Sequence, residues 1–109
     1  MILNKKTGKI ISQDETFCYS ILSQLRGLMF STRKNLIMVF DKEKKVSLHN
    51  WFVFFTIDVL FLDSEKKIVE IKRGLRPFGF YFAKKKAKYV VESGGENSTR
   101  CQIGDTLKW

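Results

Sequence analysis

The sequence predicts an α+β domain that is mainly β: a small closed or half-closed barrel of antiparallel or mixed strands, with one helix in the N-terminal half at about residues 14–26. The chain of 109 residues is 44% hydrophobic and contains 10 Phe, 3 Tyr and 2 Trp, a composition that suits pleated, half-buried surfaces. Short apolar and alternating segments follow one another from residue 36 onward, whereas a helical spacing occurs once. Closure of the sheet is expected because it removes exposed strand edges.

The N-terminal half contains a hairpin and the expected helix. Residues 1–11 read as two short strands around the turn segment NKKTG. Residues 12–15, SQDE, have the spacing of a capping box. Apolar residues then recur every four positions from Phe17 to Leu25, which is one stripe of a helix. Gly27 is expected to end that helix in the left-handed conformation.

The remainder of the chain has the period of strands. Strands are expected at residues 36–40, 45–49, 55–63, 67–74, 87–93 and 106–109. The segment DKEKK, residues 41–45, reads as a charged loop between the first two. Pro77 interrupts strand pairing because it lacks an N–H donor. Gly104 and Asp105 are expected to turn the chain into its last strand.

Asp58 lies within the most apolar run of the chain, whose two alternating faces are both hydrophobic. Such a strand is expected to be covered on both sides, and a buried carboxylate needs a partner. We therefore expect Asp58 to accept hydrogen bonds from backbone N–H groups or to pair with Arg26. The alternative is catalytic, with Asp58 and His49 as an acid–base pair, although a straight strand would point these two residues to opposite faces.

Five segments of the chain share the order and spacing of a known family. They are RGLMF (26–30), VSLHNWFVFFTIDVLFLD (46–63), KKIVEIKRGLRPF (66–78), AKYVVES (87–93) and GD (104–105). In these segments the chain resembles domain of unknown function 192, an uncharacterised conserved prokaryotic family. The resemblance implies a compact β-rich domain and no established activity. It marks six residues as signature positions: Arg26, Gly27, Asp58, Pro77, Gly104 and Asp105.

The positive charge is concentrated in one segment. The net charge is +9, and residues 72–88 hold seven basic side chains and no acid: Lys72, Arg73, Arg76, Lys84, Lys85, Lys86 and Lys88. Tyr81 lies among them, beside three Phe residues. Basic groups neutralise phosphates and exposed rings stack on bases, so these residues are candidates for binding RNA or single-stranded DNA. The opposing interpretation is a solvated lysine run with at least one aromatic face in the core.

Three functions follow from these patterns. The first is a non-catalytic ligand- or partner-binding module with a basic face, whose rim would draw on His49, Trp51, Arg76 and Tyr81 and would favour an anionic ligand. The second is binding of single-stranded nucleic acid through residues 72–88. The third is an enzyme that uses Asp58 with His49 or Arg26, but the chain shows no phosphate loop, nucleophile elbow or metal-ligand motif that would favour it.

The bulk properties fit one domain over residues 1–109. The longest apolar run, residues 51–62, is too short for a membrane-spanning helix, and the N-terminus does not read as a signal peptide, so a cytoplasmic location is expected. Cys18 and Cys101 are expected to be reduced, buried thiols. One His and two scattered Cys predict no structural metal, and no cofactor is expected.

Overall fold

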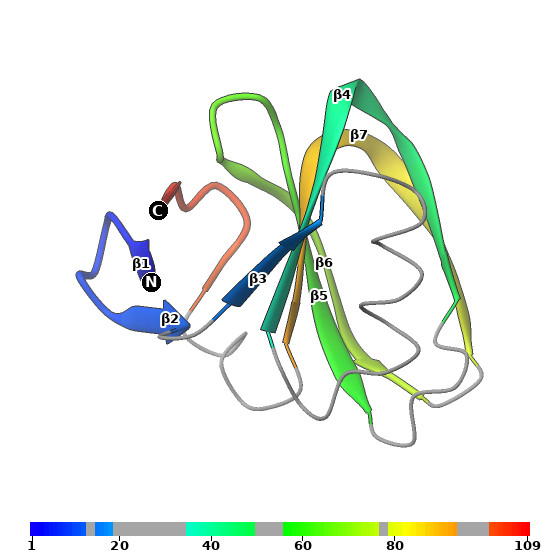
Figure 1. Cartoon of the computed structure of the whole chain (residues 1–109), viewed down its shortest axis with the longest axis horizontal. Helices are drawn as coiled ribbons and strands as arrows, with labels where there is room; N and C mark the ends of the chain where they lie inside the picture. Colours follow the sequence, from blue (N-terminus) through cyan, green and yellow to red (C-terminus); the bar gives the residue numbers. More distant parts are fainter. Residues whose placement is uncertain (13–14, 19–34, 50–55, 77–78, 94–100) are drawn as a thin grey trace.

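A computed structural model describes residues 1–12, 15–18, 35–49, 56–76, 79–93 and 101–109 (Figure 1). Within these ranges the backbone is built of strands, and no residue is helical. The strands are β1 (Ile2–Asn4), β2 (Ile10–Ser12), β3 (Glu15–Cys18), β4 (Asn35–His49), β5 (Ile57–Leu62), β6 (Ile68–Leu75), β7 (Phe80–Ser93) and β8 (Leu107–Lys108). The predicted mainly β class is confirmed.

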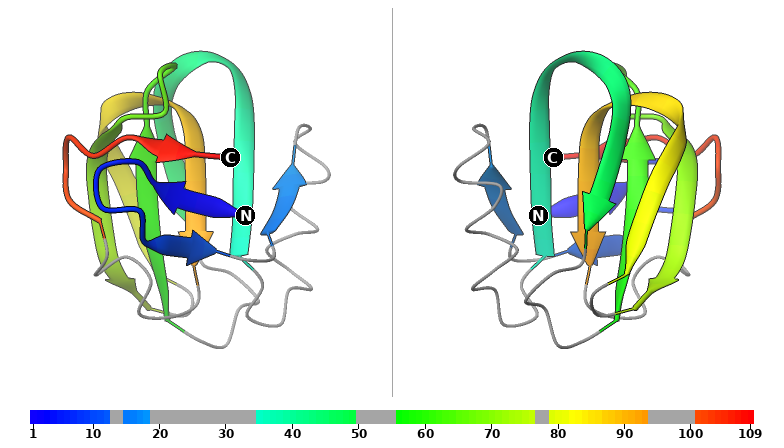
Figure 2. Two further views of the ribbon diagram at one scale, coloured as in Figure 1. Left: turned by 90° about the vertical axis from the view of Figure 1, so that its left-hand side faces the viewer. Right: turned by 90° about the vertical axis from the view of Figure 1, so that its right-hand side faces the viewer.

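The strands form two sheets that pack on each other (Figure 2). The smaller sheet has the order β2-β1-β8, and the larger has the order β3-β4-β7-β5-β6. Each described pairing is antiparallel except that of β3 with β4, which is parallel. The first and last strands, β1 and β8, are neighbours in the smaller sheet, so the two ends of the chain meet there.

The N-terminal hairpin forms as its sequence predicts. The β1–β2 turn is closed by the backbone N–H of Gly8, which donates to the carbonyl of Asn4 at 2.7 Å. Gly8 has a φ of 73°, which suits a residue without a Cβ. The Asn4 side chain accepts from the backbone N–H of Lys6 at 3.0 Å, a local contact typical of asparagine in turns.

The central strand β5 is covered on both faces, as predicted from its two apolar faces. Val59 and Phe61 belong to a cluster with residues of β4, β6 and β7, and both are fully buried. Leu60 and Leu62 belong to a second cluster, in which the smaller sheet supplies Ile2 and other apolar side chains. Two hydrophobic layers therefore meet at β5, which explains why the strand has no solvent-facing polar stripe.

Strand β4 corrects the prediction of a charged loop at residues 41–45. The strand is continuous through this segment, and Lys44 and Lys45 pair in register with Ala87 and Lys86 of β7. The side chains of residues 41–45 are exposed, so the segment has a loop-like composition although its backbone pairs as a strand. The long strands β4 and β7 bend over together at one end of the larger sheet (Figure 2).

The predicted helix at residues 14–26 is wrong over its first turn. Glu15–Cys18 forms β3 and pairs in parallel with Asn35–Met38 of β4. Pairing with a long neighbouring strand here overrides the local helical spacing. The rest of the predicted helix lies outside the described residues.

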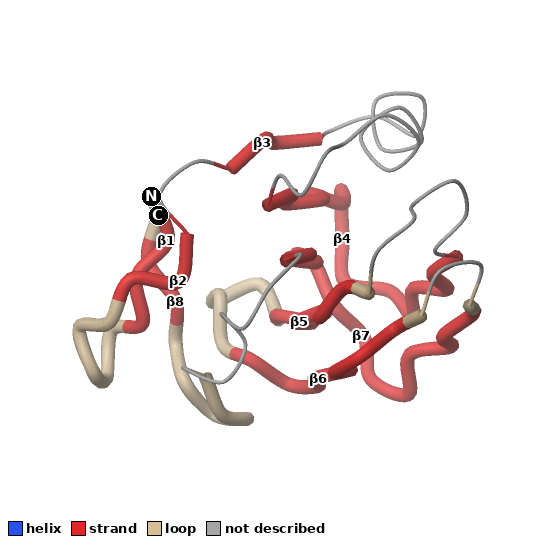
Figure 3. The backbone as a smooth tube through the Cα atoms, turned by 90° about the horizontal axis from the view of Figure 1, so that it is seen from below, coloured by secondary structure: helices blue, strands red, loops and turns tan. Residues whose placement is uncertain are grey.

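The prediction of a closed barrel is also wrong. The larger sheet has two edge strands, β3 and β6, and they do not pair with each other. The outer edge of β6 is occupied by the segment that leads to β8. Ile68 donates its N–H to the Asp105 carbonyl at 2.8 Å and accepts from the Gly104 N–H at 2.8 Å. These groups are therefore not available to another strand of the sheet. Figure 3 shows how the larger sheet curls without closing.

Candidate functional site

The first half of β7, residues 80–87, presents two aromatic side chains to solvent. Phe80 is 54% exposed and Phe82 is 67% exposed. Residues two apart on a strand share a face, so these rings lie on the same side of β7. Tyr81 and Ala83 face the other way and pack in the cluster that also contains Phe61. The alternation in the sequence therefore separates a core face from an exposed aromatic face.

Exposed lysines lie along the same two strands as the exposed rings, although Lys44 lies over the Phe40 ring at 4.5 Å. The pairing of β4 with β7 aligns Ser47 with Phe82 and Lys45 with Lys86. Six lysines of these two strands are exposed: Lys42, Lys44, Lys45, Lys84, Lys85 and Lys86. We call Phe80, Phe82 and these six lysines the β7 platform. Two acids, Asp41 and Glu43, lie in β4 between and beside these lysines. One carboxylate oxygen of Glu43 accepts a hydrogen bond from the Ser64 N–H at 2.8 Å.

A buried carboxylate holds the backbone of the platform in place. Glu70 of β6 is 8% exposed, and its Oε1 accepts from the backbone N–H groups of Lys84 and Lys85, each at 2.9 Å. The hydroxyl of Tyr81 donates to Glu70 Oε2. This hydrogen bond raises the pKa of Tyr81 to about 12, with burial and the negative charge of Glu70 acting in the same direction. Three donors therefore fix one carboxylate across the space between β6 and β7.

The seven predicted basic residues of segment 72–88 divide into two groups. Lys84, Lys85 and Lys86 are exposed on the platform, and Arg76 is exposed beyond the end of β6. The others make internal contacts: Lys72 lies over the Tyr81 ring at 5.8 Å, Lys88 lies over the Tyr89 ring at 5.8 Å, and Arg73 donates to the Cys101 carbonyl at 3.1 Å. The Tyr81 ring also packs on Phe61, with centroids 5.7 Å apart.

Asp58 is half-buried and stabilises a bulge. Ile57 and Val59 of β5 pair with Leu75 and Lys72 of β6. Only Asp58 lies between the first pair, whereas Arg73 and Gly74 both lie between the second pair, so β6 carries one extra residue. Gly74 has a φ of 70°, the conformation expected of glycine in such a bulge. Asp58 Oδ1 accepts from the Gly74 N–H at 2.8 Å. This contact is of the backbone type expected from the sequence.

The other predicted partners of Asp58 stay predictions. Arg26 lies outside the described residues, as do Gly27, Trp51 and Pro77. The backbone of His49 pairs with Phe80 at one end of β7, whereas Asp58 pairs with Ser93 at the other end. The side chain of His49 is not among those described.

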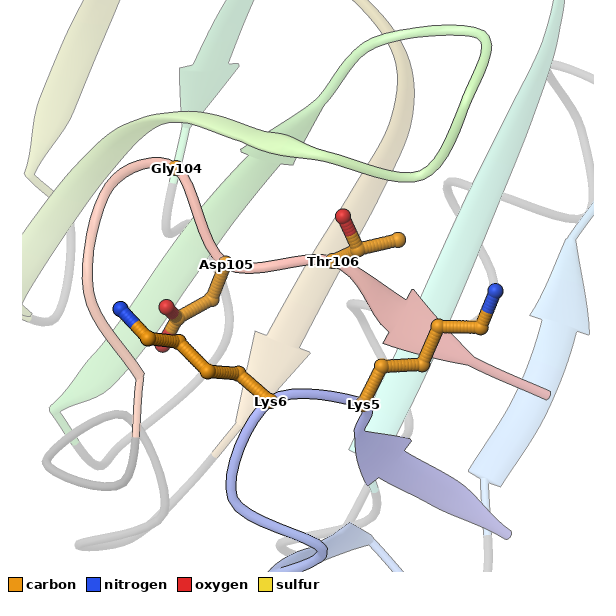
Figure 4. Close-up of a pocket in the computed structure, with 5 residues that line it drawn as sticks. All are labelled: Lys5, Lys6, Gly104, Asp105 and Thr106. Atoms are coloured by element: carbon orange, nitrogen blue, oxygen red, sulfur yellow. The ribbon is translucent and has the colours of Figure 1, made fainter.

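A second polar site lies where β1 meets the segment before β8 (Figure 4). Lys5, Lys6, Gly104, Asp105 and Thr106 line an open pocket with a volume of about 280 Å³. The signature residues Gly104 and Asp105 therefore share a pocket with two lysines from the N-terminal hairpin. Sequence reasoning missed those lysines, because nothing in the pattern near residue 5 indicates contact with residue 105.

Asp105 is 6% exposed and is held by two hydrogen bonds. Asn4 Nδ2 donates at 2.9 Å and the Gln102 N–H donates at 3.0 Å, both to Oδ2. The Asn4 hydrogen bond is the main cause that lowers the pKa of Asp105; burial opposes it, and the Gln102 N–H and the charge of Lys6 lower the pKa further. Nearby, burial raises the pKa of the Cys101 thiol to about 11, and the charge of Asp105 adds to this. Cys101 is thus buried, as predicted.

Glu92 is a buried acid that the sequence reasoning did not single out. It is 4% exposed, and its Oε1 has no hydrogen-bond partner among the described residues. Burial raises the pKa of this carboxyl to about 8. A signal was available, because Glu92 follows the apolar residues Val90 and Val91 within a predicted strand.

Two further observations concern the part of the chain that the structure describes. It contains no helix with the length and hydropathy needed to cross a membrane. Its His, Cys, Asp and Glu side chains form no group of three or more that could hold a metal ion.

Solved structures with this fold exist. One neighbour is a protein of unknown function from Novosphingobium aromaticivorans, with a TM-score of 0.78, 18% identity and coverage of 87% of this chain and 74% of that chain. Another is described as a putative transcription regulator from Sinorhizobium meliloti, with a TM-score of 0.79, 19% identity and coverage of 86% and 79%. At these identities the likeness shows the fold alone.

Archaeal relatives are similar in sequence over the whole chain. A UPF0127 protein of Thermococcus sibiricus is 34% identical over 100% of this chain and 74% of the relative. A UPF0127 protein of Pyrococcus furiosus is 36% identical over 99% of this chain and 97% of the relative. The family DUF192, described as an uncharacterized ACR, matches residues 5–109. The chain therefore belongs to domain of unknown function 192, the family that its signature segments resemble.

Proposed function

We propose that the chain is a non-catalytic binding module that takes up single-stranded nucleic acid on the β7 platform. The observation that carries this proposal is the exposure of Phe80 and Phe82, at 54% and 67%, among exposed lysines. Isolated exposed hydrophobic residues are ordinary. Two large rings on one strand face, with exposed lysines along the same two strands, are the combination that stacking and phosphate neutralisation require.

The spacing of the rings suits successive bases. A strand rises about 3.3 Å per residue, so rings two residues apart are separated by roughly 6.6 Å along β7. An extended single strand can place one base on each ring, and stacking tolerates any base because each base has a π-face. Aromatic side chains on a sheet surface bind single-stranded RNA in other folds by this geometry.

The charge of the platform suits a phosphate backbone. Exposed lysines lie along both β4 and β7, and Glu43, one of the two acids there, uses one of its oxygens to bind Ser64. Each phosphate that a lysine neutralises releases counterions, which favours binding at low salt. The Glu70 hydrogen bonds fix the backbone at Lys84 and Lys85, so less conformational entropy is lost on binding. The predicted cytoplasmic location would give access to such ligands.

The test is fluorescence anisotropy with a labelled single-stranded RNA of mixed sequence. Phe82→Ala should weaken binding roughly 5- to 150-fold, the cost of one base–aromatic stack of about 1–3 kcal/mol. The matched control is Ile103→Ala, since Ile103 is 66% exposed but lies outside the platform. Equal affinity for Phe82→Ala and Ile103→Ala would contradict stacking.

The charge contribution is measured separately by the salt dependence. Lys84→Ala should reduce the slope of log K against log salt by about 0.7, the value for one phosphate of a single strand. Lys9→Ala, which removes an exposed lysine of the N-terminal hairpin, should leave the slope unchanged. Binding that depends on lysines anywhere on the surface but on neither ring would leave only non-specific attraction, and would overturn the proposal.

A further inference from the structure

The pocket lined by Lys5, Lys6, Gly104, Asp105 and Thr106 combines positive charge with one buried carboxylate. The two ammonium groups are exposed, whereas Asp105 is 6% exposed. Figure 4 shows the Lys6 amine on the side of the Asp105 carboxylate, and the Lys5 amine on the opposite side of the pocket. The lining therefore carries a net charge of about +1, and its one negative charge lies at one side of the pocket. This arrangement suits an anion that also has a hydrogen-bond donor.

Asp105 has an acceptor to spare. Both of its hydrogen bonds from the described residues reach Oδ2, so Oδ1 receives none from that part of the chain. Oδ1 is not among the buried side-chain atoms that lack a partner, so it faces the solvent of the pocket and stays open to a ligand donor. A ligand hydroxyl group placed in the pocket can donate to Oδ1, whereas a bare phosphate would be repelled by the charge of the carboxylate.

The walls of the pocket are fixed by backbone hydrogen bonds. The Lys5 N–H donates to the Thr106 carbonyl at 2.9 Å, and the Ile68 N–H donates to the Asp105 carbonyl at 2.8 Å. Asn4, which is fully buried, ties the Asp105 side chain to the turn that carries Lys5 and Lys6. The Asp105 carboxylate and the backbone that carries Lys5 and Lys6 are thus held in one arrangement before any ligand binds, while the exposed lysine side chains stay free to turn.

We propose that this pocket binds a small hydroxylated anion: the exposed side chains of Lys5 and Lys6 turn toward its phosphate group, and a neighbouring hydroxyl group donates to Asp105. Thr106 also lines the pocket, but its side chain points away from the Asp105 carboxylate (Figure 4). The site takes small molecules and is independent of the β7 platform, which is built from other strands.

The experiment is a two-dimensional NMR titration of the full chain with glycerol 3-phosphate, inorganic phosphate and glycerol. Glycerol 3-phosphate should shift the amide signals of residues 5, 6 and 104–106 and bind at least about fivefold more tightly than phosphate, as one hydrogen bond of about 1 kcal/mol implies. Glycerol alone should produce no shift. Equal affinity for the two anions, or shifts spread over the surface lysines, would overturn the proposal.

Variants separate the two contacts. Changing Lys5 and Lys6 together to Ala should abolish binding of both anions, while Lys9→Ala should preserve it. Asp105→Asn should remove the preference for glycerol 3-phosphate and strengthen binding of phosphate, because the repulsive charge is gone. If Asp105→Asn does not fold, the wild-type preference between the two anions decides the question. Failure here leaves the RNA measurements on the β7 platform unaffected.

Discussion

The hydroxyl of Tyr81 donates a hydrogen bond to the Glu70 carboxylate and so joins β7 to β6, although these strands are not neighbours in the sheet order. The same carboxylate accepts two backbone N–H groups of β7. A side chain thus joins two strands that share no ladder of backbone hydrogen bonds. This arrangement holds Phe80 and Phe82 on the outside while Tyr81 points inward.

Tyr81→Phe should lower the free energy of unfolding by about 1–3 kcal/mol, because it leaves one oxygen of a mostly buried carboxylate without its donor. Urea unfolding measures this cost. Tyr89→Phe is the matched control, since the contacts of Tyr89 with Trp109, Lys66 and Lys88 are made by its ring. It should change stability by less than about 0.5 kcal/mol. A similar cost for both variants would contradict the bridging role.

Glu70→Gln should lower the pKa of Tyr81 from about 12 toward its ordinary value of 10, because the hydrogen bond and the negative charge of Glu70 both favour the protonated phenol. The phenolate absorbance, compared between each protein and its Tyr81→Phe form, isolates this tyrosine. An unchanged titration of Tyr81 in Glu70→Gln would count against the contact.

The Asp58–Gly74 pair predicts two separate costs. Gly74→Ala should destabilise by about 1–2 kcal/mol, because its φ of 70° disfavours a Cβ, although no atom lies within 4 Å of the added carbon. Asp58→Ala should cost about 1–3 kcal/mol by stranding the Gly74 N–H. Asp41→Ala, at an exposed position of β4, serves as control. If Gly74→Ala and Asp58→Ala both melted at the same temperature as Asp41→Ala, neither the backbone conformation of Gly74 nor the Asp58 hydrogen bond would stabilise the bulge.

Glu92 predicts a loss of stability as the pH rises. Burial raises the pKa of its carboxyl from 4.5 to about 8, so the folded state binds the proton more tightly than the unfolded state does. Between these two values stability should fall with rising pH, by up to about 1.4 kcal/mol per pH unit, and level off above pH 8. Glu92→Gln should therefore be more stable than wild type by a few kcal/mol near pH 9, with little difference near pH 4.

The measurement is chemical unfolding from pH 4 to pH 9, with Glu65→Gln at an exposed turn position as control. If the free energy of unfolding changed with pH in the same way for wild type and Glu92→Gln, Glu92 would not hold a proton in the folded chain.

The positions of strands along the chain could be predicted from the sequence where local patterns agree with the tertiary structure. The β5–β6 hairpin combines apolar alternation with turn residues, and both strands form as expected. Residues 41–45 are predicted as a loop but belong to β4, because their charges suit a solvent-facing strand and a loop equally well. Residues 15–18 are predicted as helix but form β3 for a different reason. The residues of β4 with which they pair lie about 20 residues further along the chain.

The candidate sites were predictable only in part. Alternation along residues 80–83 separates two faces of β7, but it does not reveal which face is buried, and the aromatic residue nominated for binding, Tyr81, is the one that packs inward. Neither Glu70 nor Asn4 carries a local signal, because each acts on a strand or segment distant in sequence. Lys5 and Lys6 share a pocket with Asp105 only because β1 pairs with β8 in the folded chain.

Photo-crosslinking to RNA that contains 5-bromouridine tests the central claim most directly, because the excited base reacts with a ring stacked on it. After irradiation at low salt and digestion of the full chain, mass spectrometry should place the cross-link on Phe80 or Phe82, and Phe82→Ala should reduce it. Cross-links that fall elsewhere on the chain, or that persist unchanged when both phenylalanines are replaced by Ala, would contradict binding on the β7 platform.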